Sequence, residues 1–416
     1  MTESTRRTRS CRLCDAGLET LLCDLGLSPV SNALVREEDL ERGEVFHPLK
    51  LWLCENCKLV QLEEFEPPEA IFDHDYAYFS SYADSWLAHC RRYVAHVVER
   101  FGLGAEHRVV EIASNDGYLL QYFLERGIPV LGIEPAANVA EAARAKGIPT
   151  EQCFFGAATA QRLLAEGVRA DLLVANNVLA HVPRLNDFAA GLALVLAPRG
   201  VLTVEFPHLL ELLRNNQFDT IYHEHFSYLS LFVVEQLFER HGLRVFDVQQ
   251  LPTHGGSLRV FACHRDDPRP EEPGLAAVRR LERAAGIDTH AGYGDFSRRV
   301  VETKLALLET LIALHRQGLR VCGYGAPAKA TTLLNYCGVG PELLPFTVDR
   351  SPQKQGRYIP GVRIPIRAPQ EIDRLRPDRI LILPWNLTDE ITAQLDHARR
   401  WGARFVVAIP RVRTLP

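Results

Sequence analysis

The sequence predicts an α/β protein in three parts, a small metal-binding module followed by two larger α/β units. Two Cys-x-x-Cys pairs near the N-terminus predict the first part. In each of the other two, around residues 108–134 and 320–349, an apolar strand leads into a tight turn and a later strand ends in an acid. This order is typical of parallel α/β folds. We place the three parts at residues 1–75, 76–265 and 266–416.

The composition is that of a globular protein with a full core. Of 416 residues, 47% are hydrophobic and 24% are charged, and the formal net charge is −5. This charge gives no reason to expect nucleic acid or an anionic membrane as a partner. The chain lacks an apolar run long enough to span a membrane, and its polar N-terminus lacks the apolar stretch of a signal peptide. We therefore expect a cytoplasmic protein and a monomer.

Four of the ten cysteines form two spaced pairs, Cys11 with Cys14 and Cys54 with Cys57. Each spacing lets a turn point two thiolates at one ion, so together they predict a tetrahedral, structural Zn²⁺ with no open position. The alternatives are two unrelated pairs of buried thiols or a redox pair. The redox alternative is disfavoured because neither pair follows a strand at the start of a helix. Cys23 lies outside this pattern and is expected in the core.

Two apolar runs at 49–53 and 59–62 predict strands beside the second pair. They are followed by a dense aromatic and hydroxyl segment that contains Tyr76, Tyr78 and Tyr82. This segment lies where the metal module joins the next unit, so we interpret it as a lid over an active site. A hydrophobic linker is the alternative.

The central unit begins with a buried strand at 109–112 and a tight turn at 113–117. The next strand ends at Glu134, and a carboxylate in this place accepts hydrogen bonds from ribose hydroxyls. A later strand, 171–177, ends in the Asn176-Asn177 pair, at the edge of the sheet where ligands bind. An NAD-dependent oxidoreductase or epimerase is disfavoured, because the first turn lacks Gly-x-Gly-x-x-Gly and the chain lacks a Tyr-x-x-x-Lys pair.

The run Tyr222-His223-Glu224-His225 follows a predicted strand at 202–206 and a turn at Pro207. Two histidines, a carboxylate and a phenol can remove a proton from a carbon acid and stabilise the resulting oxyanion. Histidine is the natural base because its ordinary pKa lies near physiological pH. The alternatives are a polar surface turn or a core histidine held by the carboxylate.

The C-terminal unit begins with a linker rich in proline and charge at 266–274 and a long helix at 296–317. A strand, a glycine turn and a helix follow at 320–329. Gly323 and Gly325 could cradle a diphosphate with Lys329 beside it. A structural turn between strand and helix is the alternative. Further strands are predicted at 346–349, 380–384 and 405–409.

The order of elements in the central unit resembles class I S-adenosylmethionine methyltransferases, whose first strand carries an acid followed by Gly-x-Gly-x-Gly. Here Glu111 is the acid and only Gly117 of the glycines is present. The whole chain resembles the sugar C-methyltransferases of antibiotic deoxysugar biosynthesis. This resemblance rests on the four cysteines, Glu-Ile-Ala-Ser-Asn-Asp-Gly at 111–117, Tyr-His-Glu-His-Phe-Ser-Tyr at 222–228 and His-Gly-Gly-Ser-Leu-Arg at 254–259.

The resemblance implies a zinc module, a central Rossmann-like methyltransferase domain and a second Rossmann-like domain that helps to bind a sugar nucleotide. Its cofactors would be S-adenosylmethionine and structural Zn²⁺. The implied substrate is a dTDP-linked 3-amino-4-keto-2,3,6-trideoxy sugar, methylated at C-3′. A 3-hydroxy sugar or methylation at C-5′ is the alternative within the family. A non-catalytic zinc-bearing binding module is disfavoured by the ionisable run at 222–225.

The family also implies roles for individual residues. His225 would be the base, although Tyr222 remains an alternative, and His181 has a structural alternative as a capping or core histidine. The other residues expected around the sugar are Glu224 and Tyr76, with substrate contacts from Tyr78, Tyr82, Gly323, Gly325 and Lys329. The donor pocket would consist of Glu111, Ser114, Asn115, Asp116, Gly117, Glu134, Asn176 and Asn177.

Overall fold

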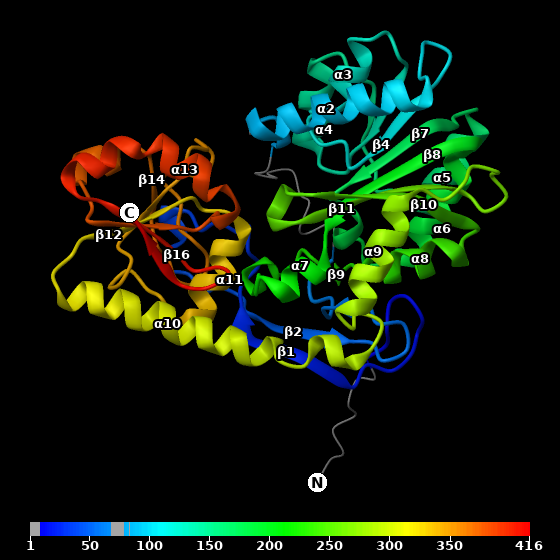
Figure 1. Cartoon of the computed structure of the whole chain (residues 1–416). Coiled ribbons are helices and arrows are strands. Elements are labelled where there is room, and N and C mark those ends of the chain that lie inside the picture. Colours follow the sequence, from blue (N-terminus) through cyan, green and yellow to red (C-terminus); the bar gives the residue numbers. More distant parts are fainter. Residues whose placement is uncertain (1–8, 68–78, 83) are drawn as a thin grey trace.

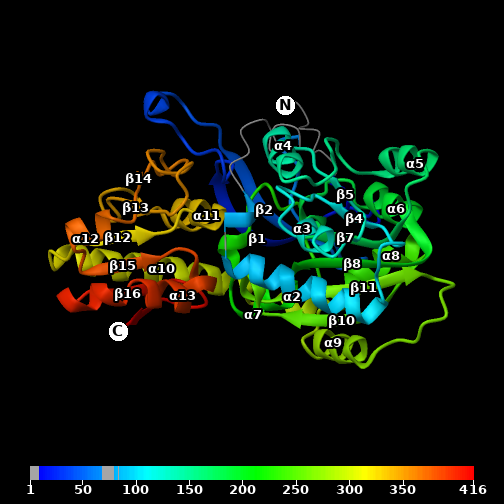
Figure 2. The same cartoon turned by 90° about the horizontal axis from the view of Figure 1, so that it is seen from above.

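The computed structural model describes residues 9–67, 79–82 and 84–416. A small N-terminal sheet lies beneath two α/β lobes, a central one and a C-terminal one (Figure 1). Seen from above, the two lobes lie side by side (Figure 2). Tyr76 and Tyr78, which the sequence places in a lid, lie outside the described residues.

The N-terminal sheet has the order β1-β2-β3-β9, and its neighbouring strands are antiparallel. Its first three strands are β1 (Thr20–Ser28), β2 (His47–Leu53) and β3 (Val60–Gln61). The fourth, β9 (Ser227–Tyr228), comes from the central part of the chain. The residues that follow the run at 222–225 therefore complete the sheet of the metal module.

The central lobe contains a seven-stranded sheet of order β10-β11-β8-β7-β4-β5-β6. Five neighbouring strands are parallel, and β10 and β11 form an antiparallel hairpin against β8. The carboxyl ends of β4, β5 and β7 therefore meet at one edge, as predicted. The strands are β4 (Val109–Ile112), β5 (Val130–Ile133), β6 (Thr150–Glu151), β7 (Ala170–Asn176), β8 (Leu196–Pro207), β10 (Leu243–Leu251) and β11 (Ser257–His264).

Helices cover both faces of this sheet because its parallel strands are apolar on both sides. In β4, Val109 packs into one apolar cluster and Val110 into another on the opposite face. The described helices are α2 (Asp84–Phe101), α3 (Leu120–Leu124), α4 (Ala137–Ala145), α5 (Ala157–Ala165), α6 (Leu185–Val195), α7 (Leu209–Arg214), α8 (Leu231–Arg240) and α9 (Pro273–Ala284).

The C-terminal lobe has a six-stranded sheet of order β14-β13-β12-β15-β16-β17, parallel except for β17. This confirms the predicted second α/β unit. Its strands are β12 (Val321–Tyr324), β13 (Thr347–Val348), β14 (Ile366–Arg367), β15 (Arg379–Ile382), β16 (Arg404–Val407) and β17 (Arg413–Leu415). Its helices are α10 (Phe296–Arg316), α11 (Ala328–Cys337), α12 (Glu371–Leu375) and α13 (Thr388–Gln394).

The N-terminal sheet and the C-terminal lobe share one apolar core. Leu49 and Leu51 of β2 belong to the same buried cluster as Leu307 of α10 and Leu334 of α11. In Figure 1, α10 runs alongside β1. The predicted domain boundaries stay predictions, since both neighbouring parts contribute to this core. Among the described residues, no helix has the length and apolar character needed to cross a membrane.

Candidate active site and zinc centre

The two Cys-x-x-Cys pairs form turns of the same geometry. The residue after each pair, Asp15 or Lys58, has a positive φ, and its amide donates to the carbonyl of the first cysteine, at 2.9 and 2.8 Å. This shape directs both thiols of each turn to one point. The four sulfur atoms lie within 4.8 Å of one another, and three of the cysteines are buried while Cys14 is partly exposed. Four clustered thiols fit a tetrahedral zinc ion and leave no position for a reactant. The four ligands are Cys11, Cys14, Cys54 and Cys57.

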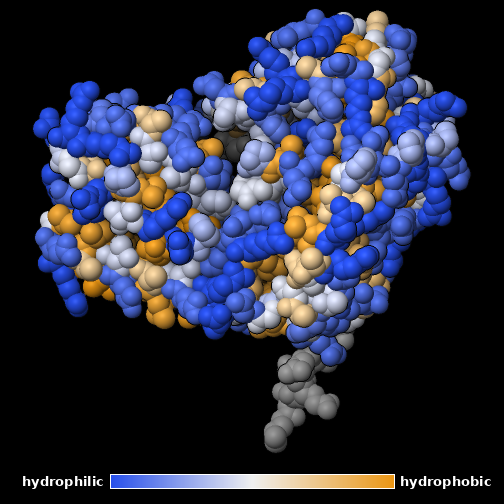
Figure 3. Space-filling model, in the orientation of Figure 1, coloured by the Kyte–Doolittle hydropathy of each residue, from blue (hydrophilic) through white to orange (hydrophobic). Residues whose placement is uncertain are grey.

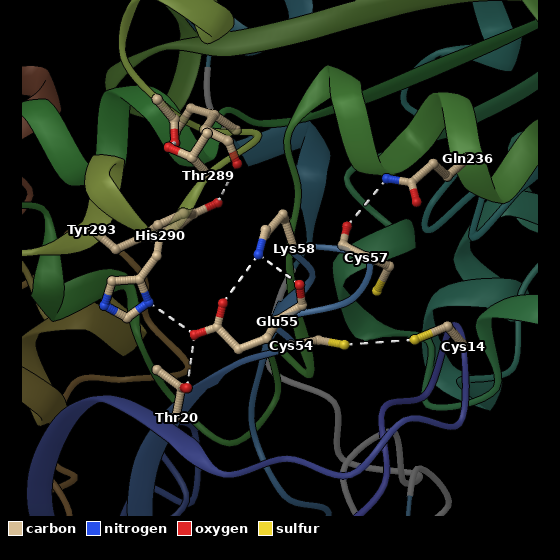
Figure 4. Close-up of polar contacts among 12 residues, drawn as sticks. Cys14, Thr20, Cys54, Glu55, Cys57, Lys58, Gln236, Thr289, His290 and Tyr293 are labelled. Carbon is tan, nitrogen blue, oxygen red and sulfur yellow. Dashed lines mark hydrogen bonds and ion pairs between the residues drawn. The ribbon is translucent and has the colours of Figure 1, made fainter.

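Hydrogen bonds attach the zinc turns to the rest of the protein. Gln61 of β3 donates from Nε2 to Sγ of Cys11 at 3.2 Å, and its Oε1 accepts from the amide of Arg12 at 3.0 Å. Gln236 of α8 donates to the carbonyl of Cys57 at 3.1 Å (Figure 4). On the exposed side of this turn, Glu55 accepts hydrogen bonds from Thr20, Lys58 and His290 (Figure 4). The zinc centre is thus held by both the N-terminal sheet and the central lobe.

The turn after β4 keeps the backbone shape of a glycine-rich motif without its glycines. Ala113, Asn115 and Gly117 have φ values of 56°, 48° and 75°. These are the three positions at which the related motif carries glycine, the residue that enters this region at least cost. Asparagine also tolerates it well. The absence of two of the motif's glycines therefore changes the side chains of this turn but not its backbone conformation.

Glu134 follows β5 and reaches back to this turn. Its two oxygen atoms accept hydrogen bonds from the amides of Asn115 and Ala136, both at 2.9 Å. Burial raises the pKa of Glu134 to about 7, although these amides oppose the shift. A bound ribose would have to share the carboxylate with the two amides. Its role in donor binding stays a prediction.

Several other predicted donor-pocket residues carry buried polar atoms that lack a partner among the described residues. They include Oγ of Ser114 and Oδ1 of Asn176 and of Asn177. Burial raises the pKa of Glu111 well above its ordinary value, and Tyr118 beside it opposes part of this shift. Orphaned polar atoms at the carboxyl edge of a parallel sheet are suited to a polar ligand.

The short segment after the undescribed stretch lies on the donor turn. The amide of Ser80 donates to Oδ1 of Asn115 at 2.9 Å, and Ser81 donates to Asp116. Tyr82 points the other way, and its phenol oxygen accepts from Gln353 of the C-terminal lobe at 3.2 Å. The segment therefore connects the donor turn to the second lobe. Its function as a lid stays a prediction.

His225 and Tyr222 lie together at the end of a loop between the lobes. Nδ1 of His225 lies 3.2 Å from the carbonyl of Thr220, which can only accept, so Nδ1 carries the proton. Nε2 is then an acceptor and lies 3.0 Å from the phenol oxygen of Tyr222. Burial, and then the nearby His181, lower the pKa of His225 well below its ordinary value. The structure thus provides a neutral imidazole whose basic nitrogen is not used by the backbone.

His181 packs edge-on against His225, with ring centres 4.6 Å apart. Its Nδ1 donates to the carbonyl of Glu224 at 2.6 Å, and burial lowers its pKa to about 4. His181 follows β7 directly, in a single turn at Leu179–His181. His181 thus lies next to His225, and its part in the chemistry stays a prediction.

Glu224 faces away from the base. Its Oε1 accepts hydrogen bonds from the amide and the side chain of Asn32, at 3.0 and 3.1 Å. It is 2% exposed, and burial raises its pKa. These contacts position the chain and do not hold the ring of His225. His223 also points into the N-terminal module, where Nε2 lies 3.3 Å from the carbonyl of Pro48.

The predicted diphosphate turn offers fewer donors than its sequence suggests. Gly323 lies inside β12, and its amide bonds the carbonyl of Phe346 at 2.8 Å. The amide of Gly325 bonds the carbonyl of Val348 at 2.6 Å. Neither amide is available to a phosphate, which favours the structural alternative for these glycines. Lys329 remains a candidate at the start of α11.

Lys329 faces the space between the lobes. Its ammonium lies 4.3 Å from the ring centre of Trp385 and 2.7 Å from Oδ1 of Asn386. Trp385 in turn donates to the buried Asp219 at 2.7 Å, and burial raises the pKa of Asp219 to about 6. The surface is hollowed where the two lobes meet (Figure 3). A positive group such as Lys329 suits an anionic ligand.

A buried cluster beside the site was not predicted. Glu205 of β8 is fully buried, accepts from Arg259 at 2.7 Å and from Thr253 at 2.9 Å, and lies 3.1 Å from Nε2 of His89. Burial alone would raise the pKa of Glu205, but His89 and Arg259 lower it to about 2. The next residue after Thr253 is His254, whose ring packs edge-on against Trp86 of α2, with ring centres 5.4 Å apart. The only sequence signal was the His-Gly-Gly run at 254–256.

A comparison of the whole chain decides the family. The C-methyltransferase NovU of Streptomyces niveus is 37% identical over 415 residues, which cover 100% of this chain and 99% of the relative. The chain belongs to the C-methyltransferase family.

Three family models match successive parts of this C-methyltransferase. They are described as "Putative zinc binding domain" for residues 11–72, "Methyltransferase domain" for 86–248 and "C-methyltransferase C-terminal domain" for 252–410. Together with the four-cysteine cluster, they identify zinc and S-adenosylmethionine as the cofactors of this C-methyltransferase.

Two solved structures match a part of this chain. Magnesium protoporphyrin IX methyltransferase from Synechocystis PCC 6803 is 15% identical with a TM-score of 0.33, covering 43% of this chain and 79% of its own. The PH0226 protein from Pyrococcus horikoshii OT3 is 14% identical with a TM-score of 0.38, covering 45% of this chain and 95% of its own.

Proposed function

We propose that this enzyme methylates C-3′ of a dTDP-linked 4-keto deoxysugar, a 3-amino-2,3,6-trideoxy sugar of antibiotic biosynthesis. One observation carries the proposal. The neutral imidazole of His225 donates from Nδ1 to Thr220, which leaves a basic Nε2 beside the phenol of Tyr222. Carbon methylation needs a base of this kind, because a C–H bond must lose its proton before carbon can attack.

The reaction follows from the acidity of the hydrogen next to a ketone. Nε2 of His225 removes the C-3′ proton, and the electron pair moves into an enolate whose negative charge lies on the C-4′ oxygen. S-adenosylmethionine supplies an electrophilic methyl group on a positively charged sulfur. The enolate carbon forms a bond to this methyl as the carbon–sulfur bond breaks, and the ketone returns. His225 leaves the step as an imidazolium that solvent deprotonates.

The protein would place the two reactants at adjoining ends of the strands. We assign the methyl donor to the turn at 113–117 with Glu134, and the sugar to the region around His225 and His181. Lys329 would contact the diphosphate, since its ammonium lies against Trp385, which bonds Asp219 of the preceding part of the chain. This arrangement holds carbon, methyl and sulfur in line, which contributes much of the rate of such transfers.

Replacing His225 by asparagine tests the proposal. His225→Asn should lower kcat on the order of 10²–10⁴-fold, the usual contribution of a general base. Binding of S-adenosylhomocysteine should be unchanged, because the donor turn lies on other strands. Exchange of the C-3′ hydrogen with deuterated water, measured without methyl donor, isolates the proton step.

His223→Asn is the matched control, since its ring points into the N-terminal module. Exchange at the wild-type rate in His225→Asn would exclude this base and make Tyr222 the first alternative. The same assay with 3-amino and 3-hydroxy sugars identifies the preferred substrate.

A further inference from the structure

The backbone at His254 has a conformation that its side chain disfavours. His254 has φ 54° and ψ 21°, and Gly255 and Gly256 follow with φ of 89° and 118°. Left-handed values are unfavourable for a residue with a Cβ atom, and they persist where the surroundings enforce them, often at functional sites. The turn alone therefore does not explain why histidine occupies this position.

Contacts from both lobes hold this turn. Thr253 donates to Glu205 at 2.9 Å, and Gln217 donates to the carbonyl of Gly255 at 2.7 Å. A Cβ atom on Gly255 would lie 2.4 Å from Trp385, a partly buried neighbour of Lys329. The turn is thus fixed between the buried Glu205 and Trp385 of the C-terminal lobe.

The ring of His254 makes one aromatic contact, and one of its nitrogen atoms lacks a partner among the described residues. It packs edge-on against Trp86 of α2, with ring centres 5.4 Å apart. Nδ1 is buried without a hydrogen-bond partner among the described residues. Burial lowers the pKa of His254 to about 4, so the ring is neutral. Trp385, which adjoins this turn and Lys329, donates to Asp219, the neighbour of the residue whose carbonyl holds Nδ1 of His225, so His254, Lys329 and His225 surround one region.

We propose that His254 contacts the keto sugar and that its Nδ1–H donates a hydrogen bond to the C-4′ oxygen. This inference rests on the proposed function. The bond strengthens while negative charge builds on that oxygen and weakens when the ketone returns, and His254 transfers no proton. A neutral imidazole polarises a carbonyl without giving up its proton. Tyr222 is less suited to this task, because its phenol already lies against Nε2 of His225.

Three variants separate the ring from the backbone. His254→Gly relieves the left-handed strain and removes the donor. His254→Asn also suits this conformation and keeps an N–H donor. His254→Ala removes the donor and keeps the strain. In the exchange assay without methyl donor, His254→Gly should be slower by about 10²–10³-fold, as for the loss of one oxyanion donor, and His254→Asn should recover part of this loss.

Binding of dTDP, which has no ketone, should be the same in wild type and all three variants by calorimetry. Exchange at the wild-type rate in His254→Gly would overturn the assignment. A loss of dTDP affinity equal to the loss of exchange would also overturn it, because His254 would then bind the nucleotide. If the wild-type enzyme neither exchanges nor methylates a 4-keto sugar, the proposed function fails, and the variants are not needed to show it.

Discussion

The phenol oxygen of Tyr222 lies 3.0 Å from Nε2 of His225, three residues further along the same loop. The base and its nearest hydrogen-bond partner are therefore positioned by one short segment. A phenol that donates to Nε2 keeps the imidazole in the tautomer that can accept a proton. Predictions for the site and its supports follow from this geometry.

The first prediction concerns pH. Burial lowers the pKa of His225 below its ordinary 6.5, so the base stays neutral at pH 6.5 and takes up a proton only in more acidic solution. The acid limb of the exchange rate should therefore lie below pH 6.5. The assay without methyl donor excludes a contribution from Glu134, whose pKa is about 7. An acid limb above pH 6.5 that His225→Asn abolishes would contradict the shift.

The second prediction concerns zinc. Wild-type protein should contain about one zinc per chain, from its four thiolates. Cys11→Ser should lose the metal and destabilise the fold by more than about 4 kcal/mol, as expected when a structural metal is removed. Cys23→Ala is the control, because Cys23 is buried outside the cluster. Metal analysis and thermal unfolding are the measurements. A Cys11→Ser protein that unfolds at the wild-type temperature but is inactive would instead indicate a metal with a part in the chemistry.

The third prediction concerns the methyl donor. Glu134→Ala removes a carboxylate that accepts two amide hydrogen bonds at the donor turn. The affinity for S-adenosylmethionine should fall by about 1.5–3 kcal/mol, which is about 10- to 150-fold. Glu141→Ala, an exposed position on α4, should bind normally. Calorimetry measures both, and an unchanged affinity in Glu134→Ala would place the ribose elsewhere.

The fourth prediction compares two glycines in the central lobe. Gly117 and Gly127 have φ of 75° and 70°, so alanine strains the backbone at both by about 1–2 kcal/mol. A Cβ atom at Gly117 would also lie 2.2 Å from Cδ1 of the buried Ile148, whereas Gly127 faces open space. Gly117→Ala should therefore cost about 1–3 kcal/mol more than Gly127→Ala. Equal unfolding midpoints in denaturant would show that Ile148 can move away.

The sequence predicted the fold well because apolar strands and tight turns are local signals. The runs at 109–112 and 296–317 correspond to β4 and α10 within one residue. The cysteine pairs were equally informative, because their spacing alone fixes the turn geometry. In contrast, β9 is a two-residue strand whose partner lies in β3. Pairing of this length and sequence separation leaves no local pattern to detect.

The candidate site was predicted in part. The sequence marks 222–225 as one unit, but in an irregular loop neighbouring side chains point in different directions. Glu224 finds its partner in Asn32, and only the folded chain brings these residues together. Likewise, the sequence shows His254 only as the first residue of the His-Gly-Gly run. The hydrogen bonds from Thr253 to Glu205 and from Gln217 to Gly255 could not be foreseen.

The pairing of β3 with β9 also bears on how the chain assembles during synthesis. The zinc ligands leave the ribosome early, but the fourth strand of their sheet follows only at Ser227–Tyr228. The apolar side of β2 is covered later still, because it packs in one cluster with Leu307 and Leu334, which are synthesised after β9. The nascent N-terminal segment thus carries reduced thiols and exposed leucines until most of the protein has been made. Early metal capture would protect these thiols, and a fragment ending near residue 75 should aggregate rather than fold.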